Sequence, residues 1–196
     1  ILRSSLAGMI KENIGQLAVY GEEGAAVAGG SRASAFAKLE QALKDASYLR
    51  KNENRYLPGF QWHFSLPIAD LKALYPVLDG KSPLVLSAHR ADDIIRLLAL
   101  AKKYSLKLVI EGGGEAWMVA KELAAAKVPV ILDPMQNLPS FEGLAVRLDG
   151  ATLLDKAGVK LMFTGGGSHN AYLVRQSAGN AVAYGLPKEV AIEAMS

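Results

Sequence analysis

The sequence predicts an α/β fold in which parallel strands alternate with helices. From residue 65 onward, an apolar run followed by a segment of helical period recurs four times. The apolar runs do not alternate with polar residues, so we expect the strands to be covered on both faces. A closed eight-stranded barrel needs about 250 residues. The 196-residue chain therefore predicts a partial TIM (β/α)8-type barrel, about the second half, or alternatively a small open doubly wound sheet.

The chain is predicted to form a single domain over residues 1–196, in which residues 1–64 are an irregular and helical lead-in and residues 65–196 hold four strand–helix units. The Gly-rich residues 1–30 are expected to form a loop with a short helical piece. Ser31 suits the N-cap of a helix that runs to about Tyr48. The predicted strands are residues 83–88, 106–110, 128–132 and 159–163. The other predicted helices are residues 65–78, 91–104, 115–126, 151–156, 170–184 and 188–195.

The composition of the chain argues against several classes of protein and of binding site. The net charge of +3 comes from scattered rather than clustered Lys and Arg, which argues against a nucleic-acid partner. No apolar run has the length of a membrane span, and no signal-peptide pattern is present. With no cysteine, disulfides, thiolate metal sites and a Cys nucleophile are excluded. The chain begins with Ile1 rather than Met, so we expect a fragment or a processed piece.

Polar and glycine residues gather where the predicted strands end. The four strand ends carry residues 89–90, 111–115, 133–135 and 164–170, which include two of the three histidines of the chain. In a parallel sheet these ends meet at one rim, where α/β proteins bind their ligands. We therefore expect the functional site at this rim.

Each rim residue has a functional and a structural interpretation. His89 is a candidate metal ligand, or else a histidine hydrogen-bonded within the rim. Glu111 and Glu115 are both candidates for a general base. Glu111 is favoured because it ends a strand, whereas Glu115 is expected in the first turn of a helix, stabilised by the helix dipole. Arg90 suits pairing with a neighbour or binding an anion, and Asp133 suits capping a loop.

Two triple-glycine turns, residues 112–114 and 165–167, precede predicted helices. Their backbone N–H groups could bind an anion, although neither turn has the spacing of a Walker loop or a dinucleotide fingerprint. A close-packed turn is the alternative. The residues predicted to bind substrate are Arg90, His169, Gly112 and Gly166.

Four segments together resemble the later half of an amidohydrolase-superfamily barrel of the imidazolonepropionase-like kind. They are residues 83–94 (PLVLSAHRADDI), 108–117 (LVIEGGGEAW), 128–134 (VPVILDP) and 157–164 (AGVKLMFT). The resemblance covers about residues 65–196 and depends on the order of the units.

This resemblance implies metal-dependent hydrolysis of cyclic or linear C–N bonds in a small-molecule amide, commonly with zinc activating a water molecule. His89 matches the family's fifth-strand histidine ligand. The sixth-strand position is Glu111 instead of histidine, and the eighth-strand aspartate position is occupied by Gly165 and Gly166. We therefore expect an incomplete metal site in this chain, with Glu111 as the catalytic residue.

Two other functions stay open from the sequence. The chain could be a non-catalytic domain that binds an anion or small ligand through its glycine turns and Arg90. It could also be an inactive truncated fragment that associates through exposed strand edges, which would make it a homo-oligomer.

Overall fold

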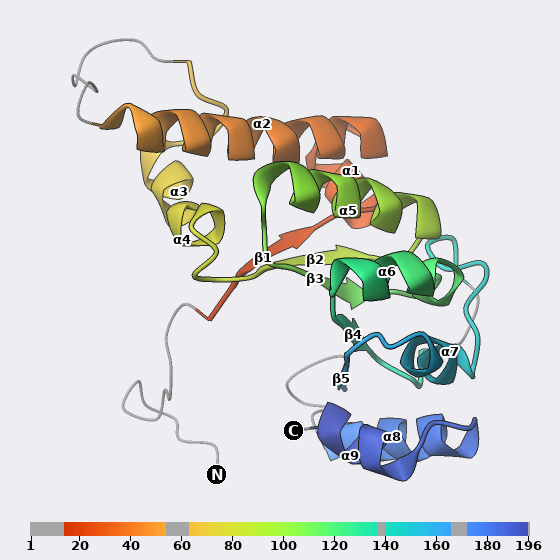
Figure 1. The fold of residues 1–196 in the computed structure, drawn as a ribbon. Helices are drawn as coiled ribbons and strands as arrows, with labels where there is room; N and C mark the ends of the chain where they lie inside the picture. The colour runs from red at the N-terminus through yellow and green to blue at the C-terminus, as the bar shows by residue number, and fades with distance from the viewer. Residues whose placement is uncertain (1–13, 54–62, 137–139, 166–171, 196) are drawn as a thin grey trace.

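The computed structural model describes residues 14–53, 63–136, 140–165 and 172–195. Its centre is one five-stranded sheet in the order β1-β2-β3-β4-β5, and every neighbouring pair of strands is parallel. The predicted class, α/β with parallel strand–helix units, is confirmed (Figure 1). The strands are β1 (Gln16–Val19), β2 (Leu84–Ala88), β3 (Leu108–Gly112), β4 (Val130–Leu132) and β5 (Leu161–Phe163).

The helices follow the predicted order with local differences. The Ser31 hydroxyl caps α2 by accepting a hydrogen bond from the Ser34 N–H at 3.1 Å. The helix predicted over residues 65–78 divides at Leu74 into α3 and α4, with Pro76 in the first turn of α4. The helices are α1 (Glu22–Val27), α2 (Arg32–Lys51), α3 (Ile68–Ala73), α4 (Tyr75–Leu78), α5 (Ala91–Tyr104), the 3-10 turn η3 (Ala116–Val119), α6 (Ala120–Ala126), α7 (Gly150–Lys156), α8 (Val174–Ala183) and α9 (Lys188–Ala194).

Strand β1 lies in the segment for which the sequence predicted loop and a short helical piece. It pairs with β2 from Gln16 opposite Leu84 to Val19 opposite Ser87. It has four residues, and its neighbours are glycine-rich, so its own sequence carries little strand signal. Pairing with β2 defines it as a strand, and the short α1 follows it directly.

The two faces of the sheet have different surroundings. Leu84, Leu86 and Ala88 of β2 are buried with residues of the helices in the main hydrophobic core. The opposite face is open, since Leu17 and Val19 of β1 are 71% and 44% exposed. The expectation that both faces are covered is therefore wrong for the part of the chain that the structure describes. Residues that would be interior in a closed barrel are apolar too, which is why the strands did not alternate in sequence.

The helices pack against the covered face of the sheet. Helix α5 packs on β3 and η3, and α7, α8 and α9 pack on β5; Figure 1 shows α5, α6 and α7 following one another beside the strands. A second, smaller core joins α2 to α3 around Leu49 and Leu71. None of the described helices is both long and apolar enough to span a membrane.

Candidate active site at the carboxyl ends of the strands

The carboxyl ends of the strands border a cavity of about 740 Å³, here called the rim cavity. This volume lies in the range of small-molecule sites, which is about 300–1,000 Å³. All five strands, or the residues directly after them, contribute to its lining. The polar lining residues include Glu23, Ser87, His89, Glu111, Asp133 and Thr164.

His89 follows the last residue of β2, and its imidazole ring lies against Gly112 at the end of β3. A Cβ atom at Gly112 would be 2.5 Å from His89 Cε1 and 2.8 Å from Nε2. Gly112 also has a φ of +90°, a conformation that residues with a Cβ rarely adopt. The imidazole can therefore occupy this place because residue 112 is glycine. His89 lines the rim cavity, and among the described residues its ring nitrogens have no hydrogen-bond partner.

The turn at residues 112–114 holds the end of β2 through its backbone. The Gly113 N–H donates to the Ala88 carbonyl at 2.9 Å, and the Glu115 N–H donates to the His89 carbonyl at 2.8 Å. These two N–H groups are therefore not free to bind an anion. Of the two interpretations of this turn, the close-packed one fits the structure, and the non-catalytic anion-binding alternative loses support here.

Glu111 belongs to a row of side chains across the open face of the sheet. The strand register places it opposite Ser87 on β2 and opposite Ile131 on β4, and all three line the rim cavity. Glu111 lies within β3 rather than directly after it. Its carboxylate makes no hydrogen bond or ion pair with another described residue, so it is available to a ligand or a water molecule.

Asp133 follows β4 and serves the structure of the rim. Its Oδ1 accepts hydrogen bonds from the Met135 N–H at 3.0 Å and from the Ser177 hydroxyl at 3.2 Å. The first is the loop cap that the sequence predicted, and the second ties the rim to α8. The Asn180 amide adds a hydrogen bond to the Pro134 carbonyl at 2.9 Å.

The other predicted site residues divide into two groups. Arg90 is the exposed N-cap residue of α5 and does not line the rim cavity. Gly166 and His169 lie outside the described residues, so their predicted contacts with substrate stay predictions.

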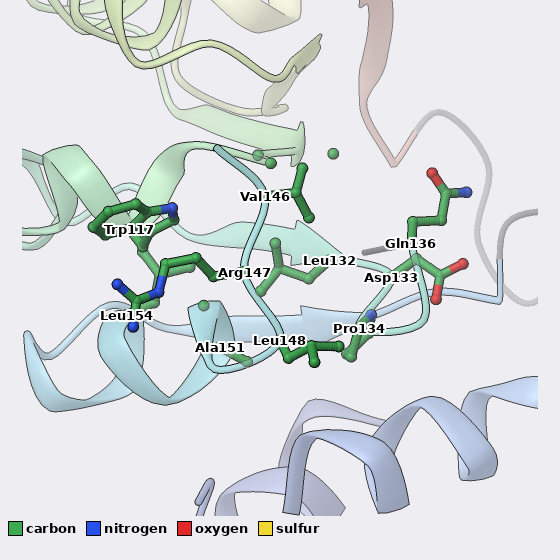
Figure 2. A pocket seen from close by; sticks show the side chains of 14 residues that line it. Trp117, Leu132, Asp133, Pro134, Gln136, Val146, Arg147, Leu148, Ala151 and Leu154 are labelled. Carbon is green, nitrogen blue, oxygen red and sulfur yellow. The ribbon is translucent and has the colours of Figure 1, made fainter. Parts of the chain in front are cut away.

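The loop between β4 and α7 forms one wall of the rim cavity through Ser140, Gly143 and Val146. The Trp117 indole N–H donates to the Ala145 carbonyl at 2.8 Å, and the Arg147 guanidinium lies 4.8 Å from the centre of the Trp117 ring. Figure 2 shows Trp117, Val146 and Arg147 around a second cavity, which is near the first and has a volume of about 40 Å³. Because this space is far smaller than a ligand site, we assign it to packing of the loop against η3 and β4.

Two glutamates join this loop to its neighbours. Glu115 Oε2 accepts from the Ala91 N–H at 3.1 Å, and its Oε1 accepts from the Ala145 N–H at 3.4 Å. Glu142 Oε1 accepts from the Glu22 N–H at 2.9 Å. From the sequence, Glu115 was expected to interact with a helix dipole, and Glu142 carried no signal, since contacts between distant segments leave no local pattern.

Arg32, the first residue of α2, is the centre of a charged cluster beside this loop. It binds Asp93 and Glu142 at 2.5 Å and Glu22 at 2.9 Å. Burial alone would lower the pKa of Arg32, but the hydrogen bond to Glu22 and the negative charges of Asp93 and Glu142 raise it above its usual value. Arg32 is thus a permanent cation that neutralises acids near the rim.

The rim does not form a complete metal site from the residues that the structure describes. Among them, no three His, Asp or Glu side chains come close enough together to hold a metal ion. His89 and Glu111 are two possible donors on one cavity, whereas zinc sites generally have three or four protein ligands. The described donors therefore do not fit a zinc ion by themselves.

Comparison with known proteins gives a fold and no sequence family. No family model and no curated protein matches this chain. The crystal structure of an amidohydrolase from Thermotoga maritima MSB8 matches 96% of the chain with a TM-score of 0.82 and 22% sequence identity. The match covers 51% of that protein, so this chain spans about half the length of the solved structure. At this identity the likeness establishes the fold alone: the chain has the parallel α/β fold of about half of that solved structure.

Proposed function

We propose that this chain carries part of the active site of a hydrolase that acts on C–N bonds, other than peptide bonds, in small cyclic or linear amides. The observation that carries the proposal is that His89 and Glu111 line one ligand-sized cavity at the carboxyl ends of parallel strands. This is where barrel enzymes hold their reacting groups. The shared fold with an amidohydrolase supports it, and the finer imidazolonepropionase-like assignment is supported by the sequence segments alone.

In this proposal Glu111 is the general base. Its carboxylate has no partner among the described residues and faces the cavity beside Ser87. It accepts a proton from a water molecule while the water oxygen forms a bond to the amide carbonyl carbon. It then passes this proton to the amide nitrogen as the C–N bond breaks, which leaves an acid and an amine. A general base of this kind contributes about 10²–10⁴-fold to the rate.

His89 is the residue of this chain that we propose as a donor to a divalent metal, zinc being the first candidate. Since the described residues do not complete such a site, no step of the reaction is assigned to the metal. Isothermal calorimetry with zinc tests the donor role directly. Measurable binding that is lost in His89→Ala supports it, and equal binding by both proteins contradicts it.

Hydrolysis itself is tested with the full chain on a panel of five- and six-membered cyclic amides and N-acyl amino acids. Release of amine or acid is followed with and without added zinc. Glu111→Gln should lower the rate by about 10²–10⁴-fold, while Glu122→Gln, on the exposed surface of α6, should leave it unchanged. Absence of turnover on the whole panel contradicts the proposed function, and full activity of Glu111→Gln contradicts the role of Glu111.

A further inference from the structure

We propose that Glu115 is a positioning residue for His89, an inference that rests on the proposed function because it concerns the same site. Glu115 itself does not line the rim cavity. It reaches His89 through the backbone of three neighbouring segments of the rim, and it does so with both its main chain and its side chain.

The first contact is with the segment that carries His89. The Glu115 N–H donates to the His89 carbonyl at 2.8 Å. Its carboxylate oxygen Oε2 accepts from the N–H of Ala91, the first residue of α5, at 3.1 Å. This N–H has no acceptor within the helix, so Glu115 satisfies it. Residues 89 and 91 are thus both fixed by one side chain and its own backbone, which limits how the peptide between β2 and α5 can rotate.

The second contact is with the loop between β4 and α7. Glu115 Oε1 accepts from the Ala145 N–H at 3.4 Å, and Trp117, two residues further on, donates to the carbonyl of the same Ala145 at 2.8 Å. The next residue, Val146, lies over Gly114, where an added Cβ would be 3.0 Å from its Cγ2. The loop is therefore held at a residue that adjoins the wall of the rim cavity.

The third contact is between the imidazole ring and the glycine turn against which it packs. An added Cβ at Gly112 would be 2.5 Å from the ring, and one at Gly114 would be 3.7 Å from Nδ1. Both glycines belong to the turn of residues 112–114, which immediately precedes Glu115 in the chain. The same residue thus anchors the backbone that carries the ring and ends the turn against which the ring packs, so a loss of its carboxylate should change where the ring lies.

The experiment measures His89 itself and needs no substrate. Ring ¹H–¹³C NMR signals of the histidines are recorded for the wild type, Glu115→Ala, Glu115→Gln and the control Glu122→Ala, and His89→Gln assigns the His89 signal. Amide hydrogen exchange is followed at Ala91 and Ala145. We expect Glu115→Ala to shift the His89 ring signal and to speed exchange at both amides by about tenfold. Glu115→Gln keeps one acceptor oxygen, so it should slow exchange again at one of the two amides and shift the ring signal less.

The outcomes separate a positioning role from a structural one. Faster exchange with an unmoved His89 signal in both variants overturns the proposal, because a merely structural role changes stability but not the ring's surroundings in the folded state. If Glu115→Ala does not fold, the same criterion applies to Glu115→Gln. A shifted His89 signal in a protein without hydrolytic turnover leaves the positioning role standing and contradicts the proposed function alone.

Discussion

Replacing Gly112 with alanine should destabilise the protein, because the imidazole ring of His89 lies against this glycine. In Gly112→Ala the new Cβ would be 2.5 Å from His89 Cε1, and the backbone φ of +90° would be kept. A left-handed conformation costs a residue with a Cβ about 1–2 kcal/mol. Moving the ring away from its preferred rotamer costs about 0.5–1.5 kcal/mol more. The free energy of unfolding should therefore fall by about 2–3 kcal/mol.

Gly158→Ala is the matched control for the backbone. Gly158 has a φ of +86°, and an added Cβ there meets no atom within 4 Å, so its substitution carries the conformational cost without the contact. Urea unfolding should show Gly112→Ala to be about 1 kcal/mol less stable than Gly158→Ala, a difference of about 2–4 °C in Tm for a chain of this size. The NMR signal of the His89 ring should move in the first variant and not in the second.

A double-mutant cycle isolates the ring's share of this cost. In a His89→Ala background the clash no longer exists, so Gly112→Ala should then cost as much as Gly158→Ala does. Equal losses for the two glycine variants in the wild-type background, together with an unmoved His89 signal, would refute the placement of the imidazole against Gly112.

Three further predictions concern charge and burial away from the cavity. Arg32→Met removes the partner of Asp93, which is 5% exposed, and should lower the free energy of unfolding, measured in urea, by about 2–3 kcal/mol. Arg50→Met, which removes an exposed ion pair, should lower it by less than about 1 kcal/mol. Equal losses in the two variants would contradict the expectation that the buried pair matters more. The Tyr75 hydroxyl is buried without a partner among the described residues, so Tyr75→Phe should raise Tm by about 2–4 °C, and a lower Tm would count against it. Burial, followed by the negative charge of Asp93, raises the pKa of Tyr20 above its usual 10.0. The neutral form is therefore favoured in the folded state, and the stability that it contributes is present below pH 10.0 and is lost as the pH rises through the folded pKa. Urea titrations at alkaline pH should show a smaller loss for Tyr20→Phe than for the wild type.

Long local patterns predicted the repeating part of the fold well. The helix expected over residues 91–104 is α5, with the same limits, and Asp92 and Asp93 lie in its first turn. The helical period and the acids at the start of α5 are local signals that tertiary contacts did not override. By contrast, β1 depends on pairing with β2, which no local pattern in a glycine-rich segment could indicate.

The candidate site was predictable to the extent that it follows from parallel strands. Because strand ends share a rim, the sequence placed His89 and Glu111 near each other, and both line the rim cavity. The contacts that build the rim were not predictable. Arg32 binds acids from three separate segments, and Glu115 binds the start of α5 and the loop between β4 and α7. Such contacts depend on the tertiary structure and leave no recognisable spacing in the sequence.

The alternation of side chains along the strands has a consequence for how this protein can vary. In β2 and β4, the odd-numbered Val85, Ser87 and Ile131 border the cavity, while the even-numbered Leu86 and Val130 are buried in the core. Residues that contact a ligand and residues that stabilise the core thus occupy different positions of the same strands. A library randomised only at the odd-numbered positions that line the cavity should yield many folded members with diverse pocket chemistry.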